Sequence, residues 1–222
     1  MKLAIVIPVK SASRAKYRLE AVLSEAERSR LALTTARDVF GAVSKLQGYG
    51  LFVISDDPAM LEEGRRFGLE PLTDRVSQGQ SAAVQQGFAA AWDRGYTAAL
   101  TIPADVPAVT TEELDELCRY RPEIEVLLAP DREHTGTNGL RLVPPHAITL
   151  RFGEDSFNLH LTEARRANRS VEVKEVEGLR YDLDRPDDIV AFMQLNRQTA
   201  TRELLTELAV LERVLAATPP RV

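Results

Sequence analysis

Apolar runs alternate with amphipathic segments along almost the whole chain. Four runs of four to six mostly apolar residues have the length and composition of strands buried on both faces: 3–7, 51–54, 98–102 and 125–130. Shorter extended segments are predicted at 69–72, 140–143, 171–176 and 179–183. In the segments between them, apolar residues recur at three- and four-residue steps, which is typical of helices. Strands that alternate with helices predict an α/β fold with a mostly parallel central sheet flanked by helices.

The predicted helices have identifiable starts. Residues 24–27 have the S-x-x-E form of a capping box. Asp57 directly before Pro58 has the pattern of an N-cap followed by a first-turn proline, so a capping role is favoured for this acid. Two further helices are predicted at 189–195 and 201–215, and the last is a candidate packing or dimer surface.

Size and composition restrict the class of protein. The 222 residues suit one large α/β domain, expected over 1–216 with a flexible tail at 217–222. The formal net charge of −5 argues against a general nucleic-acid or membrane-surface binder. A lone cysteine, Cys118, excludes a disulfide framework. The N-terminus lacks the pattern of a signal peptide, and no stretch approaches the ~20 apolar residues of a membrane-spanning helix. These features predict a soluble, cytoplasmic protein.

A basic loop follows the first predicted strand. It carries Lys10, Arg14, Lys16 and Arg18, with no acid among them. Open α/β sheets place ligand sites, phosphate sites among them, at the carboxyl ends of their strands. The alternative is that these side chains only solvate a surface loop, as isolated lysines usually do. Neither G-x-x-x-x-G-K nor G-x-G-x-x-G is present, so a nucleotide would have to be bound in another way.

Aspartates are placed at the ends of two other predicted strands. Asp105 lies between Pro103 and Pro107, on a stiff stretch of backbone. Asp182 and Asp184 are two residues apart, which on a strand points both to the same side. Asp184 could serve only as the N-cap of the next helix. Cations beside clustered carboxylates at one sheet edge indicate a triphosphate held by lysines and by Mg²⁺.

Glycine-containing loops supply further candidate sites. The segment 133–139 is polar and rich in hydroxyls and backbone donors. Gly153 and Ser156 precede a predicted helix, and a glycine at a helix start is a ready anion site, although Ser156 could merely cap the helix. His160 is expected to pack or bond locally. Gly79 and its small neighbours either leave room for a flat ligand or pack a helix tightly on the sheet.

Together these motifs resemble the guanylyltransferases of coenzyme F420 biosynthesis, a branch of the nucleotidyltransferases related to molybdenum-cofactor guanylyltransferase. The segments that carry the resemblance follow in order along the chain: 7–10, 15–19, 23–28, 103–107, 136–138, 151–160 and 182–184. The resemblance implies a single domain with a nucleotide-diphospho-sugar transferase-like fold, a Rossmann-like three-layer sandwich. It also implies an enzyme that joins GTP to a phosphorylated three-carbon acid and releases pyrophosphate. The acid is phosphoenolpyruvate in bacterial members, 2-phospho-L-lactate in archaeal members and 3-phosphoglycerate in some relatives. Phosphoenolpyruvate is the favoured acceptor here and would give enolpyruvoyl-2-diphospho-5'-guanosine.

The resemblance also implies roles by position. Asp105, Asp182 and Asp184 would hold two Mg²⁺ ions, and Lys10 and Lys16 would face the GTP phosphates. The expected catalytic residues are Lys10, Lys16 and Asp105. Residues expected at the nucleotide are Pro8, Val9, Lys10, Lys16, Gly79, Ser81 and Asp105. Those expected at the acid acceptor are Thr137 or Asn138, with Gly153 and Ser156.

Two positions depart from the family pattern, and other functions stay open. Tyr17 stands where a small Ser or Thr is usual, and Ser81 stands where asparagine is common, which bears on purine selectivity. The alternatives are a nucleotide-sugar or cytidylyl transferase on the same fold and a non-catalytic GTP-binding protein. A glycosyltransferase that uses 182–184 as its D-x-D motif is a further alternative, but the motif lies late in the chain for that role.

Overall fold

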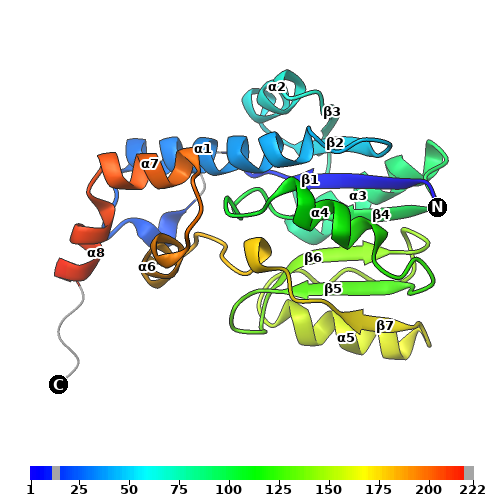
Figure 1. The fold of residues 1–222 in the computed structure, drawn as a ribbon. Helices are drawn as coiled ribbons and strands as arrows, with labels where there is room; N and C mark the ends of the chain where they lie inside the picture. The colour runs from blue at the N-terminus through cyan, green and yellow to red at the C-terminus, as the bar shows by residue number, and fades with distance from the viewer. Residues whose placement is uncertain (12–15, 218–222) are drawn as a thin grey trace.

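The computed structural model describes residues 1–11 and 16–217, which form a seven-stranded sheet with helices on both sides (Figure 1). The strands lie in the order β3-β2-β1-β4-β6-β5-β7. Their bounds are β1 Leu3–Pro8, β2 Gly50–Ser55, β3 Glu70–Thr73, β4 Ala98–Thr101, β5 Val126–Pro130, β6 Thr137–Leu142 and β7 Val171–Val173. β6 runs antiparallel to β4 and β5, and the other neighbouring pairs are parallel. The predicted α/β fold with a mostly parallel sheet is confirmed.

Two helical layers explain why the central strands are apolar on both faces. On one face lie α1 (Glu25–Val43), α2 (Pro58–Arg66) and α4 (Thr111–Arg119), and on the other lie α3 (Gln80–Asp93) and α5 (Ser156–Arg166). Alternate side chains of β1 face the two layers: Ile5 packs with the α1 and α4 side, and Val6 packs with the α3 and α5 side. A strand covered on both sides has no polar face, and β1 is buried along Leu3–Ile7.

The predicted helix starts at 24–27 and at Asp57 are confirmed. The capping box is present, because Glu27 N donates to Ser24 Oγ and Ser24 N donates to Glu27 Oε2 at 2.8 Å. Asp57 is the N-cap of α2, and its Oδ1 accepts a hydrogen bond from Ala59 N at 2.9 Å. Asp57 thus has a structural role, as the cap of α2.

Three C-terminal helices form a separate core with the start of the chain. They are α6 (Pro186–Gln194), α7 (Ala200–Glu207) and α8 (Val210–Ala217), and they lie together beyond the sheet at one end of α1 (Figure 1). Their apolar side chains pack against Leu19 of the short 3-10 helix η2 (Tyr17–Leu19) and against Leu31 of α1. The prediction of one helix over 201–215 was wrong, because Ala209 takes a φ of 49° and divides α7 from α8. Of the expected tail at 217–222, Ala217 ends α8 and the rest lies outside the described residues.

Residues 179–183 do not form the predicted strand. A 3-10 helix, η3 (Glu177–Leu179), is followed by irregular backbone, and β7 ends at Val173 rather than at 176. The main chain of this segment bonds to the neighbouring sheet edge instead of to a strand. Leu179 O accepts from Asn138 Nδ2 at 2.8 Å, and Leu183 N donates to Asp105 O at 3.1 Å. These bonds hold the aspartates on either side of Leu183 beside the ends of β4 and β6.

Within the described ranges, no helix has both the length and the apolar character that a membrane span requires.

Candidate active site

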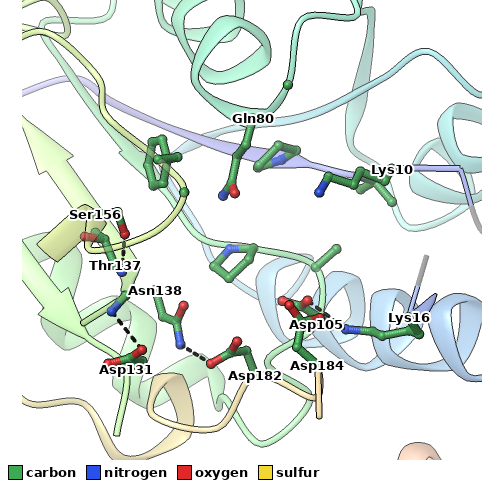
Figure 2. Close-up of a pocket in the computed structure, with 18 of the residues that line it drawn as sticks. Lys10, Lys16, Gln80, Asp105, Asp131, Thr137, Asn138, Ser156, Asp182 and Asp184 are labelled. Atoms are coloured by element: carbon green, nitrogen blue, oxygen red, sulfur yellow. Dashed lines mark hydrogen bonds and ion pairs between the residues drawn. The ribbon is translucent and has the colours of Figure 1, made fainter. Parts of the chain in front are cut away.

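A cavity of about 990 Å³ opens at the carboxyl edge of the sheet. Parallel strands β1, β2 and β4 end beside it: Pro8 ends β1, Ile54 is the next-to-last residue of β2, and Pro103 follows the last residue of β4 by two positions. Antiparallel β6 begins beside it, at Thr137. The residues predicted for the site that line the cavity are Pro8, Val9, Lys10, Lys16, Gly79, Asp105, Thr137, Asn138, Gly153, Ser156, Asp182 and Asp184 (Figure 2). Segments far apart in sequence therefore converge at one cavity, as expected. Of the predicted site residues, only Ser81 does not line it. Arg14 of the basic loop lies outside the described residues.

Lys16 stands between two of the carboxylates. Its backbone is left-handed, with a φ of 59°, at the start of η2, and its side chain is only 4% exposed. Lys16 Nζ lies 2.7 Å from Asp105 Oδ2 and 3.1 Å from Asp184 Oδ1 (Figure 2). Burial alone would lower the pKa of Lys16, but Asp105 and Asp184 outweigh burial and raise this pKa above its ordinary value. Lys16 is therefore a permanent cation.

The two late aspartates are in different electrostatic states. Burial, and then the neighbouring charge of Asp105, raises the pKa of Asp182 to about 7, although Asn138 Nδ2 donates to Asp182 Oδ1 at 2.9 Å. For Asp184, burial also acts to raise the pKa, but the contact with Lys16 outweighs it and lowers the pKa. Of these three carboxylates, Asp182 is the one for which residues 1–11 and 16–217 supply no ion pair.

The donor set of this cluster fits Mg²⁺. Mg²⁺ takes oxygen ligands, commonly one or two carboxylates plus substrate phosphates, and Asp105, Asp182 and Asp184 present carboxylates to the cavity. Among residues 1–11 and 16–217, no three His, Cys, Asp or Glu side chains are already arranged to hold a metal ion. Lys16 occupies the space between two of the three acids. Burial and the charge of Asp105 raise the pKa of Asp182, and a divalent cation held by the three carboxylates would oppose both effects by favouring the ionised form.

The opposite side of the cavity offers hydroxyls and a helix start. Ser156 is the first residue of α5, and its Oγ accepts a hydrogen bond from Thr137 N at 3.0 Å (Figure 2). The positive end of the α5 dipole attracts anions, while the N–H groups of Ser156 and Phe157 in its first turn already donate to Gly153 O and Thr135 O. Gly153 has a φ of 126°, which glycine adopts readily, and it lines the cavity beside Ser156. This hydroxyl-lined side contains Thr137, while Asn138 faces Asp182 instead.

The start of α3 borders a third side of the cavity. Gly79 has a φ of 91°, and nothing lies within 4 Å of the position that a Cβ would take. The positive φ therefore explains why residue 79 is a glycine, and tight packing on the sheet does not. Ser81 was predicted to bind the nucleotide, but it is not among the cavity-lining residues, and its Oγ accepts from Phe152 N at 2.9 Å. Ser81 therefore connects α3 to the loop that carries Gly153.

Several cavity residues were not predicted from the sequence, Gln80 and Asp131 among them. Gln80, the first residue of α3, points its carboxamide into the cavity (Figure 2). Asp131 lies directly after β5 and accepts hydrogen bonds from Thr135 N at 2.9 Å and Gly136 N at 2.8 Å. The position of Asp131 after a buried strand is the signal that indicated Asp105, and it could have been used here as well. For Gln80 no such signal exists.

Comparison with known proteins identifies the family. A family model described as "Guanylyl transferase CofC like" matches residues 3–216. A phosphoenolpyruvate guanylyltransferase from Rubrobacter xylanophilus is 38% identical over 193 residues, which cover 85% of this chain and 92% of that protein. A 2-phospho-L-lactate guanylyltransferase from Methanocaldococcus infernus is 30% identical over 184 residues, which cover 83% of this chain and 81% of that protein.

Solved structures with low sequence identity share the fold. A protein assigned as a nucleotide-diphospho-sugar transferase from Desulfovibrio desulfuricans matches with a TM-score of 0.76 at 18% identity, over 96% of this chain and 99% of that chain. A nucleotidyl transferase from Methanothermobacter matches with a TM-score of 0.63 at 15% identity, over 86% of this chain and 95% of that chain. At these identities the likeness concerns the fold alone. The family match over residues 3–216, together with these curated relatives, shows that the chain belongs to the CofC-like guanylyl transferase family and is a nucleotidyltransferase.

Proposed function

We propose that this enzyme joins GTP to a phosphorylated three-carbon acid, phosphoenolpyruvate before 2-phospho-L-lactate or 3-phosphoglycerate, and releases pyrophosphate. The observation that supports this most is the division of one cavity into two chemically different sides. The side with Lys16 and three carboxylates suits a triphosphate with Mg²⁺. The side with Thr137, Ser156 and the start of α5 suits the carboxylate of the acid. With phosphoenolpyruvate the product is enolpyruvoyl-2-diphospho-5'-guanosine, which we place in coenzyme F420 biosynthesis.

The proposed reaction needs no catalytic base. A phosphate monoester has a second pKa of about 6, so the acceptor is mostly a dianion at neutral pH. One of its oxygens attacks the α-phosphorus of GTP, the bond from that phosphorus to the oxygen bridging to the β-phosphorus breaks, and pyrophosphate leaves with the electron pair. No proton has to be removed from the acceptor.

The difficulty of this reaction is the repulsion between two anions. Lys16 keeps its proton because its pKa is raised, so it acts as a fixed positive charge and not as an acid or base. Lys10 is exposed at the end of β1 and lines the same cavity, where it can approach the phosphates. Mg²⁺, when bound to the carboxylates, would supply the remaining positive charge. The hydroxyl-lined side would hold the acid so that its phosphate faces the nucleotide.

The test is product analysis with matched substrates. The protein is incubated with MgCl2 and GTP plus phosphoenolpyruvate, 2-phospho-L-lactate or 3-phosphoglycerate, and products are identified by mass spectrometry while pyrophosphate is measured. We expect a guanylylated acid and one pyrophosphate for each product, with no reaction after EDTA. Parallel reactions contain ATP, CTP or UTP, with the same acids and with sugar phosphates. Turnover of a sugar phosphate with another nucleotide, and none with GTP and the three acids, would contradict the proposal.

A further inference from the structure

His160 lies behind the hydroxyl-lined side of the cavity and touches two of its components. It belongs to α5, one turn after Ser156, and its side chain is fully buried. Its Nδ1 lies 3.0 Å from Thr137 Oγ1, and its Nε2 lies 2.9 Å from the backbone nitrogen of Arg151. The ring therefore joins the start of β6 to the loop that carries Gly153, without lining the cavity itself.

The hydrogen-bond partners of His160 determine its tautomer. A backbone N–H can only donate, so Nε2 must accept from Arg151 and cannot carry a proton. Burial lowers the pKa of His160 to about 4, so the ring is neutral at neutral pH and carries its one N–H proton on Nδ1. That N–H donates to Thr137 Oγ1. The hydroxyl of Thr137 thus accepts from His160, and its own proton stays available.

The hydroxyl of Ser156, like that of Thr137, accepts a hydrogen bond from a protein group. Its Oγ accepts a hydrogen bond from Thr137 N, so its hydroxyl proton also stays available. Among the described residues, neither hydroxyl donates to a protein group. Both residues line the cavity, and each has a hydroxyl proton that it can donate to a ligand there. Carboxylate and phosphate oxygens of an ionised ligand accept hydrogen bonds and cannot donate, so they match two such hydroxyls.

We infer that His160 is a positioning residue, which fixes the Thr137 hydroxyl as a hydrogen-bond donor to the acid substrate through the Nδ1-protonated tautomer. This inference rests on the proposed function, because it concerns the acid that the hydroxyl-lined side binds. A purely structural His160, packed edge-on against the Phe152 ring at a centroid distance of 4.8 Å, would affect stability but not the affinity for one substrate.

The tautomer can be tested without any substrate. The chain has three histidines, so a long-range ¹H–¹⁵N spectrum of the full-length protein resolves each ring, and His160→Gln assigns the signal of His160. At pH 7 we expect the pattern of a neutral ring protonated on Nδ1. A ring protonated on Nε2, or a charged ring, would overturn the inference even if the proposed guanylyl transfer is confirmed.

Kinetics test whether His160 acts through Thr137. We expect His160→Gln to raise the KM for phosphoenolpyruvate about fivefold to tenfold, the scale of one lost hydrogen bond, with kcat and the KM for GTP changed less than about twofold. Thr137→Val should give a similar rise, and the double variant should give no further rise. The matched control is His146→Gln, an exposed histidine that contacts Trp92 near the C-terminal end of α3 and whose substitution should change neither KM nor kcat.

The other outcomes are also decisive. An unchanged KM for phosphoenolpyruvate in His160→Gln would overturn the inference. So would a KM in the double variant that rises by the product of the two single-variant increases, because the two residues would then act independently. If His160→Gln does not fold, His160→Asn takes its place, and the spectrum of the unmodified protein still decides the tautomer. If the unmodified protein forms no product, the proposed function fails separately. Calorimetric titration with phosphoenolpyruvate then applies the same comparison to Kd, and no detectable binding by the unmodified protein would overturn the inference.

Discussion

Replacing Asp105 with Asn tests the charged side of the cavity most directly. The substitution keeps the size and shape of the side chain and removes one negative charge. Asp105 Oδ2 lies 2.7 Å from the buried ammonium of Lys16, and Asp105 is also the neighbour that helps to raise the pKa of Asp182. The change therefore removes one carboxylate from the cluster and alters the electrostatic surroundings of Lys16 and Asp182.

The two electrostatic effects of Asp105→Asn on folding oppose each other. Lys16 loses one partner but keeps Asp184 at 3.1 Å, while Asp182 loses a repulsive neighbour. Asp105 is 28% exposed, so solvent weakens both effects. We expect the free energy of unfolding to change by no more than about 1–2 kcal/mol. The catalytic loss should be larger, at least ~10²-fold or about 3 kcal/mol, which is typical of removing one key electrostatic group.

The assay is the initial rate of pyrophosphate release at saturating GTP, acid and MgCl2, with urea unfolding measured on the same samples. The matched control is Asp57→Asn, the same chemical change at the same edge of the sheet. Asp57 caps α2, and Asn caps a helix about as well as Asp, so we expect a rate within about twofold of the unmodified enzyme. A near-normal rate for Asp105→Asn, with folding intact, would refute its role as a metal ligand and in catalysis.

Four further perturbations test other parts of the structure. Lys16→Met should lower the free energy of unfolding, measured by urea unfolding, by about 2 kcal/mol. This is less than the ~3–5 kcal/mol lost when a fully buried ion pair is broken, because the side chains of its partners are 28% and 43% exposed. The control Lys10→Met, at an exposed position, should leave stability unchanged. His160 should lower the free energy of unfolding by at most about 3 kcal/mol as the pH falls from 6.5 to about 4, because unfolded His160 takes up a proton near pH 6.5 and folded His160 only near pH 4. The raised pKa of Asp182 acts in the opposite direction over an overlapping pH range, so the His160 part is measured as the difference between the curves of the unmodified protein and of His160→Gln. Two curves of the same shape would contradict it. Arg141→Met should lower the free energy of unfolding by about 3 kcal/mol or more, measured by thermal unfolding, because the buried guanidinium donates to main-chain carbonyls between 117 and 124. Arg141→Lys should recover little of this stability, because an ammonium cannot reach the same set of carbonyls. Gln80→Ala should raise the KM for GTP about tenfold and leave the KM for the acid unchanged, while equal effects on both would show that Gln80 is not at the nucleotide.

The strands that the sequence predicts best are those buried on both faces. β1, β2, β4 and β5 appear as unbroken apolar runs because helices cover both sides of the sheet. Asp105 was predictable for a related reason, since it follows such a run on a proline-stiffened backbone. These signals are local, so they can be recognised without knowing the rest of the fold.

The errors concern segments whose conformation depends on distant partners. Residues 179–183 alternate apolar and polar side chains like a strand, but their main chain bonds to the Asn138 side chain and to the Asp105 carbonyl. Ser81 follows a glycine at a helix start, as a ligand-binding residue could, but it is held by Phe152 N, 71 residues later in the chain. Which way Gln80 points is likewise set by the position of α3 on the sheet and not by its neighbours in sequence.

The sequence predicted that Lys16 contacts a phosphate, but it did not predict the ion pairs of Lys16 with two aspartates. Its position in a basic loop predicted a phosphate contact, and the structure adds its contacts with Asp105 and Asp184. Clustered carboxylates without a cation raise one another's pKa and tend to take up protons, which would remove charged metal ligands. Lys16 opposes this: the pKa of Asp184, which it contacts, is lowered, while the pKa of Asp182, which it does not contact, rises to about 7. A lysine at this position therefore keeps part of the cluster ionised.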